Sequence, residues 1–92
     1  MINKIKTYIG FAIKSNKILL GTDNILASNK PKLVLISDEL SENAEKKLSK
    51  NNKCFKLKKQ EFETAVTING VKAIAVVDVS LAETIKKLLE VQ

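Results

Sequence analysis

The chain has 92 residues and a formal net charge of +6 at pH 7, with 45% hydrophobic and 28% charged residues. This length predicts a single domain over residues 1–92, and the composition is that of a folded protein rather than a disordered tail. No apolar run approaches the roughly 18 residues of a membrane span, and the lysine-rich start lacks the apolar core of a secretion signal. We therefore expect no membrane partner.

The chain has a single cysteine, Cys54, which cannot form a disulfide within the chain. It stands beside Phe55 in an apolar stretch, so we expect a buried thiol. A reducing cytoplasm is the compartment that this cysteine usage favours.

All 16 basic residues are lysines, and histidine is absent. Residues 1–60 carry 13 lysines and five acidic residues, whereas residues 61–92 carry three lysines and five acidic residues. Lysine binds phosphate as a compact charge but gives no bidentate recognition of a base. The uneven distribution favours a basic face for nucleic acid, although each lysine taken alone is equally well explained as a solvated surface charge.

The first part of the chain predicts alternating helices and strands. Isoleucines at helical spacing predict a helix over residues 2–15. A short apolar strand follows over 17–20 and ends at Gly21, and a second helix runs from there to about residue 28. The continuous apolar run 33–36 predicts a strand that is covered on both faces.

The second part continues the alternation. The predicted elements are a surface helix over 42–51, an edge strand over 54–57, a helix over 60–66 and a buried strand over 71–77. A capping box of Ser80 and Glu83 predicts the start of a fifth helix. This order predicts an α/β fold, a three-layer α/β/α sandwich around a mixed sheet of about four strands.

The corner after the first strand reads Gly21, Thr22, Asp23 and Asn24. The first amides of a helix have no partner within the helix and attract anions, which on this basic chain suggests an RNA backbone. The alternative is an ordinary strand-to-helix turn in which Thr22 or Asp23 is the cap.

Enzyme chemistry has little support. Without histidine there is no ready proton shuttle near neutral pH, and Cys54 has no histidine or arginine to activate it. Asp38, Glu39 and Glu42 could form a weak oxygen site for a metal, but an acidic turn before a helix is more often a cap. Asp78 stands where doubly wound enzymes bind ligands, yet it fits better as part of the start of the fifth helix. Glycine-rich nucleotide motifs are absent. We therefore expect no cofactor, no metal and no catalysis.

Four stretches carry a resemblance to a known family: residues 8–17 followed by Gly21, then 32–48, 76–78 and 82–87. Together they resemble the kink-turn RNA-binding ribosomal proteins of the L-seven-Ae and L-thirty-e superfamily, most of all its small bacterial YlxQ-like branch. The resemblance covers nearly the whole chain. It implies the sandwich fold and a ribonucleoprotein function, the binding of kink-turn RNA with sheared G·A pairs.

The RNA motif of that superfamily is Gly-x-Asn-Glu-x-x-Lys at the start of the second helix. Gly21 matches, and Thr22 takes the free position. Asp23 stands for the asparagine, Asn24 for the glutamate and Ala27 for the lysine. In the family the amide and the carboxylate contact guanine edges. Here Asn24 could still do so, while Asp23 can only accept hydrogen bonds.

A second family element, a Leu-Gly-x-Ala loop that packs on an extruded nucleotide, corresponds to residues 62–65. Phe62 could stack on a base there, with Ala65 beside it, although Glu63 replaces the family glycine. The alternative is that Phe62 is a core residue of its helix. Glu39, from the acidic pair after the second strand, joins the RNA-binding set by the same resemblance.

The resemblance and the charges together define two hypotheses. In the first, the chain is a non-enzymatic RNA-binding protein whose partners are ribosomal or other structured RNA and, with it, ribosomal or RNA-metabolism proteins. In the second, it is a protein-interaction module of the same fold with a decayed RNA site, as Asp23, Ala27 and Glu63 suggest. In the first hypothesis, the corner 21–24 and the loop 58–65 form one face. The lysines that hold phosphates on this face are Lys14, Lys17, Lys30, Lys32, Lys58 and Lys59.

Overall fold

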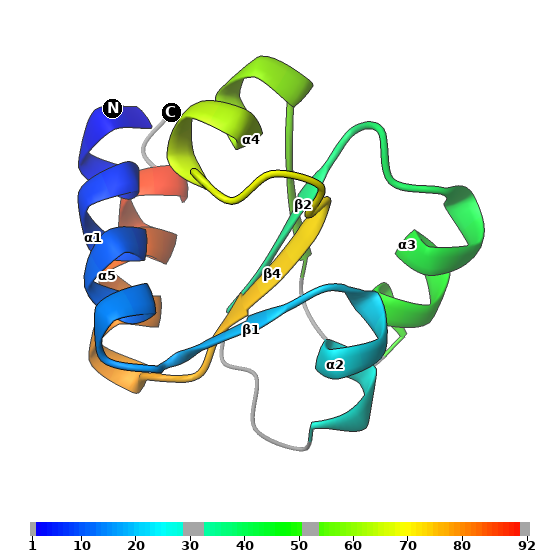
Figure 1. The fold of residues 1–92 in the computed structure, drawn as a ribbon, viewed down its shortest axis with the longest axis horizontal. Helices are drawn as coiled ribbons and strands as arrows, with labels where there is room; N and C mark the ends of the chain where they lie inside the picture. Colours follow the sequence, from blue (N-terminus) through cyan, green and yellow to red (C-terminus); the bar gives the residue numbers. More distant parts are fainter. Residues whose placement is uncertain (1, 29–32, 51–53, 91–92) are drawn as a thin grey trace.

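Helices and strands alternate along the chain as the sequence predicts (Figure 1). The computed structural model describes residues 2–28, 33–50 and 54–90. The helices are α1 (Ile2–Lys14), α2 (Thr22–Ala27), α3 (Glu42–Ser49), α4 (Lys59–Ala65) and α5 (Val79–Glu90). The strands are β1 (Ile18–Leu20), β2 (Leu33–Ser37), β3 (Cys54–Leu57) and β4 (Ala73–Val76).

The strands form one four-stranded sheet in the order β1-β4-β2-β3. β4 runs antiparallel to both of its neighbours, whereas β2 and β3 are parallel. The predicted mixed sheet is therefore confirmed. β3 lies at an edge, as its alternating lysines predict, and the exposed Lys56 is on that strand.

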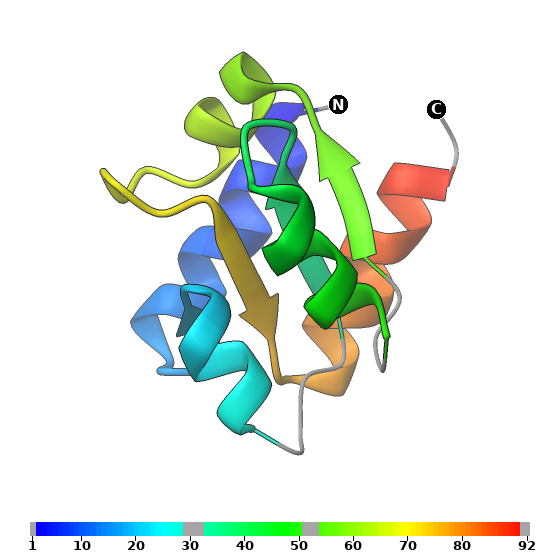
Figure 2. The same cartoon turned by 90° about the vertical axis from the view of Figure 1, so that its right-hand side faces the viewer.

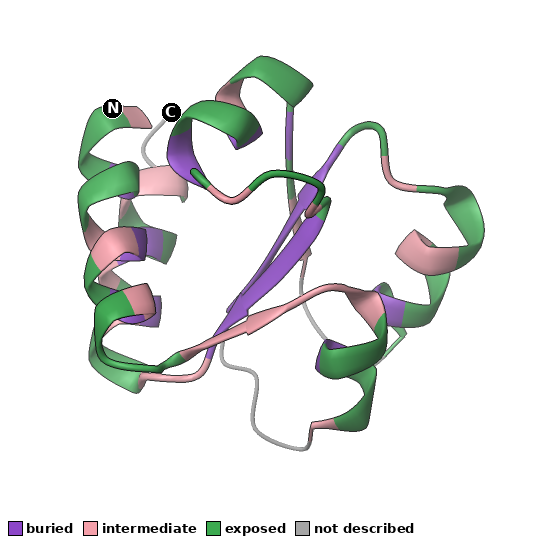
Figure 3. Ribbon diagram, in the orientation of Figure 1, coloured by how far each residue is buried: buried purple, intermediate pink, exposed green. Residues whose placement is uncertain are grey.

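The two central strands are buried on both faces, because their side chains alternate between two hydrophobic clusters. On β2, Leu33 and Leu35 face one cluster, while Val34 and Ile36 face the other. All residues of β2 and β4 are buried (Figure 3). This explains why the run 33–36 is apolar throughout rather than alternating with polar residues.

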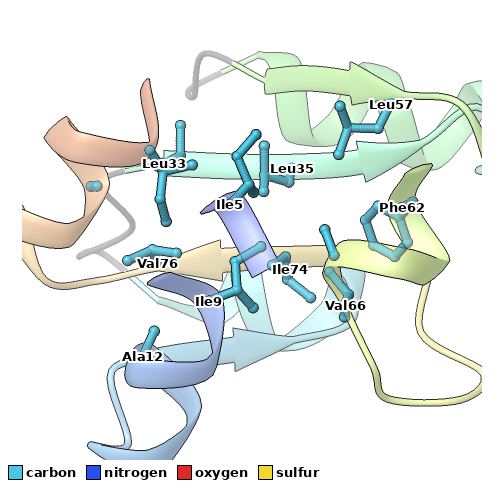
Figure 4. Close-up of a cluster of buried hydrophobic side chains, with 13 residues drawn as sticks. Ile5, Ile9, Ala12, Leu33, Leu35, Leu57, Phe62, Val66, Ile74 and Val76 are labelled. Carbon is cyan, nitrogen blue, oxygen red and sulfur yellow. The ribbon is translucent and has the colours of Figure 1, made fainter. Parts of the chain in front are cut away.

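α1, α4 and α5 cover one face of the sheet (Figure 1). The stripe of α1 that predicts the helix is also its buried face, with Ile5 and Ile9 fully buried. Figure 4 shows both side chains lying over Leu35 and Ile74 of the central strands. Phe62 of α4 completes this cluster toward the end of β2.

α2 and α3 cover the opposite face (Figure 2). Each is short and buries one large side chain, Ile25 on α2 and Leu48 on α3. Opposite them, β4 offers only Ala73 and Ala75. The three-layer sandwich is confirmed, and its two helical layers are unequal in buried apolar volume.

α5 begins two residues earlier than the capping box predicts. The Asp78 carboxylate accepts a hydrogen bond from the Leu81 N–H at 2.9 Å, so Asp78 is the N-cap and Val79 is the first helical residue. Ser80 lies within the first turn. The prediction of Ser80 as the cap is therefore wrong, and the role of Asp78 in starting the helix is confirmed.

Candidate functional site

The sheet topology gathers several of the predicted site residues at one end of the sheet. β1, β2 and β3 all end at this side, and β4 begins there. Backbone hydrogen bonds of 2.9 Å join Gly21 N–H to the Ala73 carbonyl and Ser37 N–H to the Lys72 carbonyl. We name this side the strand-end edge. It comprises residues 21–24, 37–40, 58–59 and 66–72.

Gly21 makes the corner between β1 and α2. Its φ of 86° and ψ of 154° lie in a region that is essentially restricted to glycine. The Gly21 carbonyl accepts the Ile25 N–H at 3.1 Å, which closes the first turn of α2. The glycine of the resemblance is therefore required here by backbone geometry, whatever the corner binds.

The three polar residues after Gly21 lie inside α2, and the N-cap position has no side-chain hydrogen bond. The prediction that Thr22 or Asp23 caps this helix is therefore wrong. Asn24 instead donates its Nδ2 hydrogen to the Leu20 carbonyl at 2.8 Å, which ties α2 back to the end of β1. Asp23 and Asn24 are exposed and Thr22 is half-buried, so all three are within reach of a ligand at this edge.

Two shallow hollows adjoin along the strand-end edge. The larger, of about 270 Å³, lies between the Gly21 corner and the loop before β4, and Thr22 and Leu40 line it. The smaller, of about 130 Å³, lies between that loop and α4. Both are lined by Gly70, Val71 and Lys72, so this loop joins them into one continuous surface.

Charges of both signs meet at this edge. Lys58, Lys59 and Lys72 are its exposed lysines. The exposed carboxylates are equal in number: Asp23, Asp38 and Glu39. Lys59 Nζ lies 3.6 Å from Glu39 Oε2, a solvent-exposed pair that contributes little to stability. The strand-end edge is thus close to neutral, and the excess positive charge of the chain lies elsewhere.

The structure places Lys14 and Lys17 away from the strand-end edge. Lys14 ends α1, and Lys17 precedes β1, at the opposite end of that strand from Gly21. The Lys17 carbonyl accepts the Val77 N–H at 2.9 Å, beside the end of β4. Lys30 and Lys32 lie outside the described residues. The prediction that Lys14 and Lys17 share one face with the Gly21 corner is therefore wrong.

Phe62 and Ala65 are core residues. Only 1% of Phe62 and 2% of Ala65 is exposed, and both lie in α4 rather than in a loop. Figure 4 shows the Phe62 ring directed toward the sheet. The prediction of a base-stacking platform at Phe62 is wrong, and the alternative of a core residue is confirmed.

The loop that follows α4 is not among the site residues predicted from the sequence. Residues 66–72 lie where the two hollows meet, and Gly70 has a φ of 81°. The Asn69-Gly70 dipeptide is a turn signal, and the exposed Lys72 directly precedes a buried strand. These two features together could have pointed to the loop.

Cys54, whose thiol the sequence predicts to be buried, is half-buried. Cys54 begins β3, at the opposite end from the strand-end edge. Burial raises the pKa of its thiol, the Glu45 carboxylate adds to this, and a hydrogen bond with Ser49 opposes it. A thiol with a raised pKa is a poor nucleophile at neutral pH. Within residues 2–28, 33–50 and 54–90, no group of three potential metal ligands lies together, Asp38, Glu39 and Glu42 included.

The comparisons with known proteins support the fold alone. No protein-family model matches the chain, and no curated protein does. A solved structure from Bacillus halodurans, described as a protein with unknown function, is similar, with a TM-score of 0.81. At 19% sequence identity, the match covers 95% of this chain and 97% of that one. In the described part of the chain, no helix is long and apolar enough to cross a membrane.

Proposed function

We propose that this chain is a non-enzymatic RNA-binding protein of the kink-turn superfamily that it resembles, and that the strand-end edge contacts a folded RNA. The observation that carries the proposal is the juxtaposition of the Gly21 corner with the loop 66–72 along two joined hollows. The hollows, of about 270 and 130 Å³, are smaller than ordinary small-molecule sites, and their lining mixes polar side chains such as Thr22, Thr67 and Lys72 with apolar ones. Such a surface suits the irregular shape of a bent RNA better than a small metabolite. The cytoplasm is the compartment that we propose.

The chemistry of the corner supports contacts with bases rather than with phosphates alone. Asp23 is an exposed acceptor, and guanine presents N1–H and N2–H donors when its pairing edge is free. The half-buried Thr22 hydroxyl lines the larger hollow and can donate or accept. Lys72 before β4 and Lys58 after β3 lie farther along the same edge and would contact phosphates.

A carboxylate at an RNA interface gives the proposal a test with two opposite outcomes. If Asp23 accepts hydrogen bonds from guanine, Asp23→Ala removes a base contact, and the affinity for a kink-turn RNA falls by about fivefold to a hundredfold. If lysines merely hold phosphates, the same substitution removes a repulsive charge, and the affinity rises. A mobility shift at two salt concentrations measures the sign.

The matched controls use a second carboxylate and a second RNA. Glu83→Ala removes an exposed carboxylate from α5, away from the strand-end edge, and should leave the affinity unchanged. The same RNA with its G·A pairs replaced should lose its advantage over random RNA. Equal binding to both RNAs, together with a gain of affinity in Asp23→Ala, would contradict the proposal.

The charge balance of the edge favours one further candidate, a protein-interaction module. Equal numbers of exposed lysines and carboxylates at the edge attract a phosphate backbone less than a basic face would. Such a mixed surface is suited to the polar rim of a protein–protein interface. Partners recovered from native lysate that survive ribonuclease treatment would favour this candidate. Partners lost on that treatment favour RNA.

A further inference from the structure

The outer face of α1 is strongly basic. Residues 1–22 contain no acidic residue, and Lys4, Lys6 and Lys14 of α1 are exposed. Ion pairs among the described residues involve Lys56, Lys59 and Lys86, and no lysine of α1 lies within 4.0 Å of a described carboxylate. This helix therefore carries a positive potential that its own surroundings do not neutralise at close range, in contrast to the strand-end edge.

The same face carries an exposed aromatic ring. Phe11 is 51% exposed, although Ile9 and Ala12 beside it in the sequence are buried in the core. Its ring lies 6.2 Å from the Tyr8 ring at an interplanar angle of 65°, an edge-to-face arrangement. Tyr8 packs partly against the core, so it supports Phe11 from one side and leaves the rest of the Phe11 ring in solvent.

The helical repeat aligns this ring with two of the lysines. Lys4 precedes Phe11 by two turns, about 10 Å along the axis, and Lys14 follows by one turn, about 4.5 Å. Lysines on both sides of an exposed ring are placed to contact the phosphates that flank a base stacked on that ring. Stacking on an aromatic ring accepts any base, and lysines follow a backbone without reading sequence.

We propose that the outer face of α1 binds a single-stranded stretch of RNA, with Phe11 stacking on a base and with Lys4 and Lys14 contacting the phosphates on either side. That the nucleic acid is RNA rests on the proposed function. The argument for a binding surface on α1 rests instead on Phe11 and the lysines of this helix. α1 lies on the face of the sheet opposite α2 and the Gly21 corner (Figure 1). The two surfaces would therefore hold different parts of one RNA, a folded element and the single strand that leaves it.

The chain contains one tyrosine and no tryptophan, so its intrinsic fluorescence reports on Tyr8, next to Phe11. Titration of the full chain with oligouridylate of about 12 nucleotides should quench this fluorescence. The anisotropy of end-labelled oligouridylate gives the affinity independently of the tyrosine. Oligodeoxythymidylate of the same length tests the choice of RNA.

Phe11→Ala should weaken oligouridylate binding by about fivefold to a hundredfold. Leu26→Ala, which removes another exposed apolar side chain (40% exposed) from α2, should leave the affinity unchanged. The double variant Lys4→Ala/Lys14→Ala should reduce the slope of log K against log salt by about 1.4. The matched variant Lys46→Ala/Lys47→Ala on α3 should change that slope much less.

Three results would overturn the inference: unchanged affinity in Phe11→Ala, an equal loss of slope in the two lysine variants, or tighter binding of the deoxy oligomer. Phe11 is exposed, so we expect its variant to fold, which circular dichroism would check. The proposal for the strand-end edge is tested separately, because the affinity of Asp23→Ala is measured with a folded RNA. The same variant should bind oligouridylate at least as tightly as the unmodified chain does. Binding of the oligomer by α1 with no recognition of the kink-turn would refute only the proposed function.

Discussion

Two glycines of this chain differ in what their backbone requires. Gly21 has a φ of 86°, and an added Cβ would meet nothing within 4 Å, so the restriction is conformational and not steric contact with neighbours. Gly10 lies in the middle of α1, also with open space around it and without a positive φ. The same substitution should therefore act in opposite directions at the two positions.

We predict that Gly21→Ala lowers the free energy of unfolding by about 1–3 kcal/mol, the cost of an alanine in this backbone region. Gly10→Ala should raise it by about 0.5–1 kcal/mol, because alanine loses less backbone entropy in a helix. Urea denaturation followed by circular dichroism measures both changes. A neutral Gly21→Ala would mean that the corner is not held in the conformation described.

We predict a pH profile for Cys54 that follows from its burial. The pKa of the thiol is raised above its ordinary value, so alkylation by iodoacetamide should need a higher pH in the folded chain than in the unfolded chain. As the pH rises, the unfolded chain ionises first. The free energy of unfolding is therefore unaffected below the ordinary thiol pKa and falls as the pH approaches the native value.

Substitutions around the thiol separate the causes of this shift. Ser49→Ala removes a hydrogen bond that lowers the pKa, so it should move the alkylation profile further up. Glu45→Gln removes a nearby negative charge and should move it down. A profile that matches the unfolded chain in all variants would contradict the assigned burial.

At the scale of elements, the start of α5 gives a direct comparison of two capping candidates. Asp78 accepts the Leu81 N–H, whereas Ser80 lies inside the helix. We predict that Asp78→Ala lowers the free energy of unfolding by about 1 kcal/mol and that Ser80→Ala changes it by less than about 0.5 kcal/mol. Thermal unfolding of both variants decides between the two assignments. A larger destabilisation by Ser80→Ala than by Asp78→Ala would favour Ser80 as the cap.

The helices and strands could largely be predicted because each has a strong local signal. The isoleucines of α1 repeat at helical spacing, and the run 33–36 is apolar without interruption. Asn16, between α1 and β1, has a φ of 57°, a conformation that asparagine tolerates better than most residues. The predicted start of α5 is two residues too late, because Asp78 and Ser80 are both good caps and the sequence does not say which one is used.

At the scale of the whole molecule, the candidate site could be predicted only in part. Lys17 and Gly21 lie at opposite ends of β1, so the predicted strand already separates them. Which other strand ends lie beside Gly21 depends on the direction and order of the strands, which no local pattern encodes. Phe62 looks the same in a sequence whether it stacks on a base or fills a core, and only packing against α1 and the sheet decides. Lys72 reaches the site from a loop distant in the sequence, through pairing between β2 and β4.

The unequal layers of the sandwich have a consequence for how the protein opens. Ile25 and Leu48 are the buried residues that attach α2 and α3, and they pack on the small side chains of Ala73 and Ala75. Short helices with few buried contacts open at a low free energy, without unfolding of the rest. Amide hydrogen exchange should therefore begin in this layer, ahead of α1 and β4. A ligand bound at the Gly21 corner would then slow amide exchange throughout α2, because it would add contacts that stabilise this helical layer against local opening.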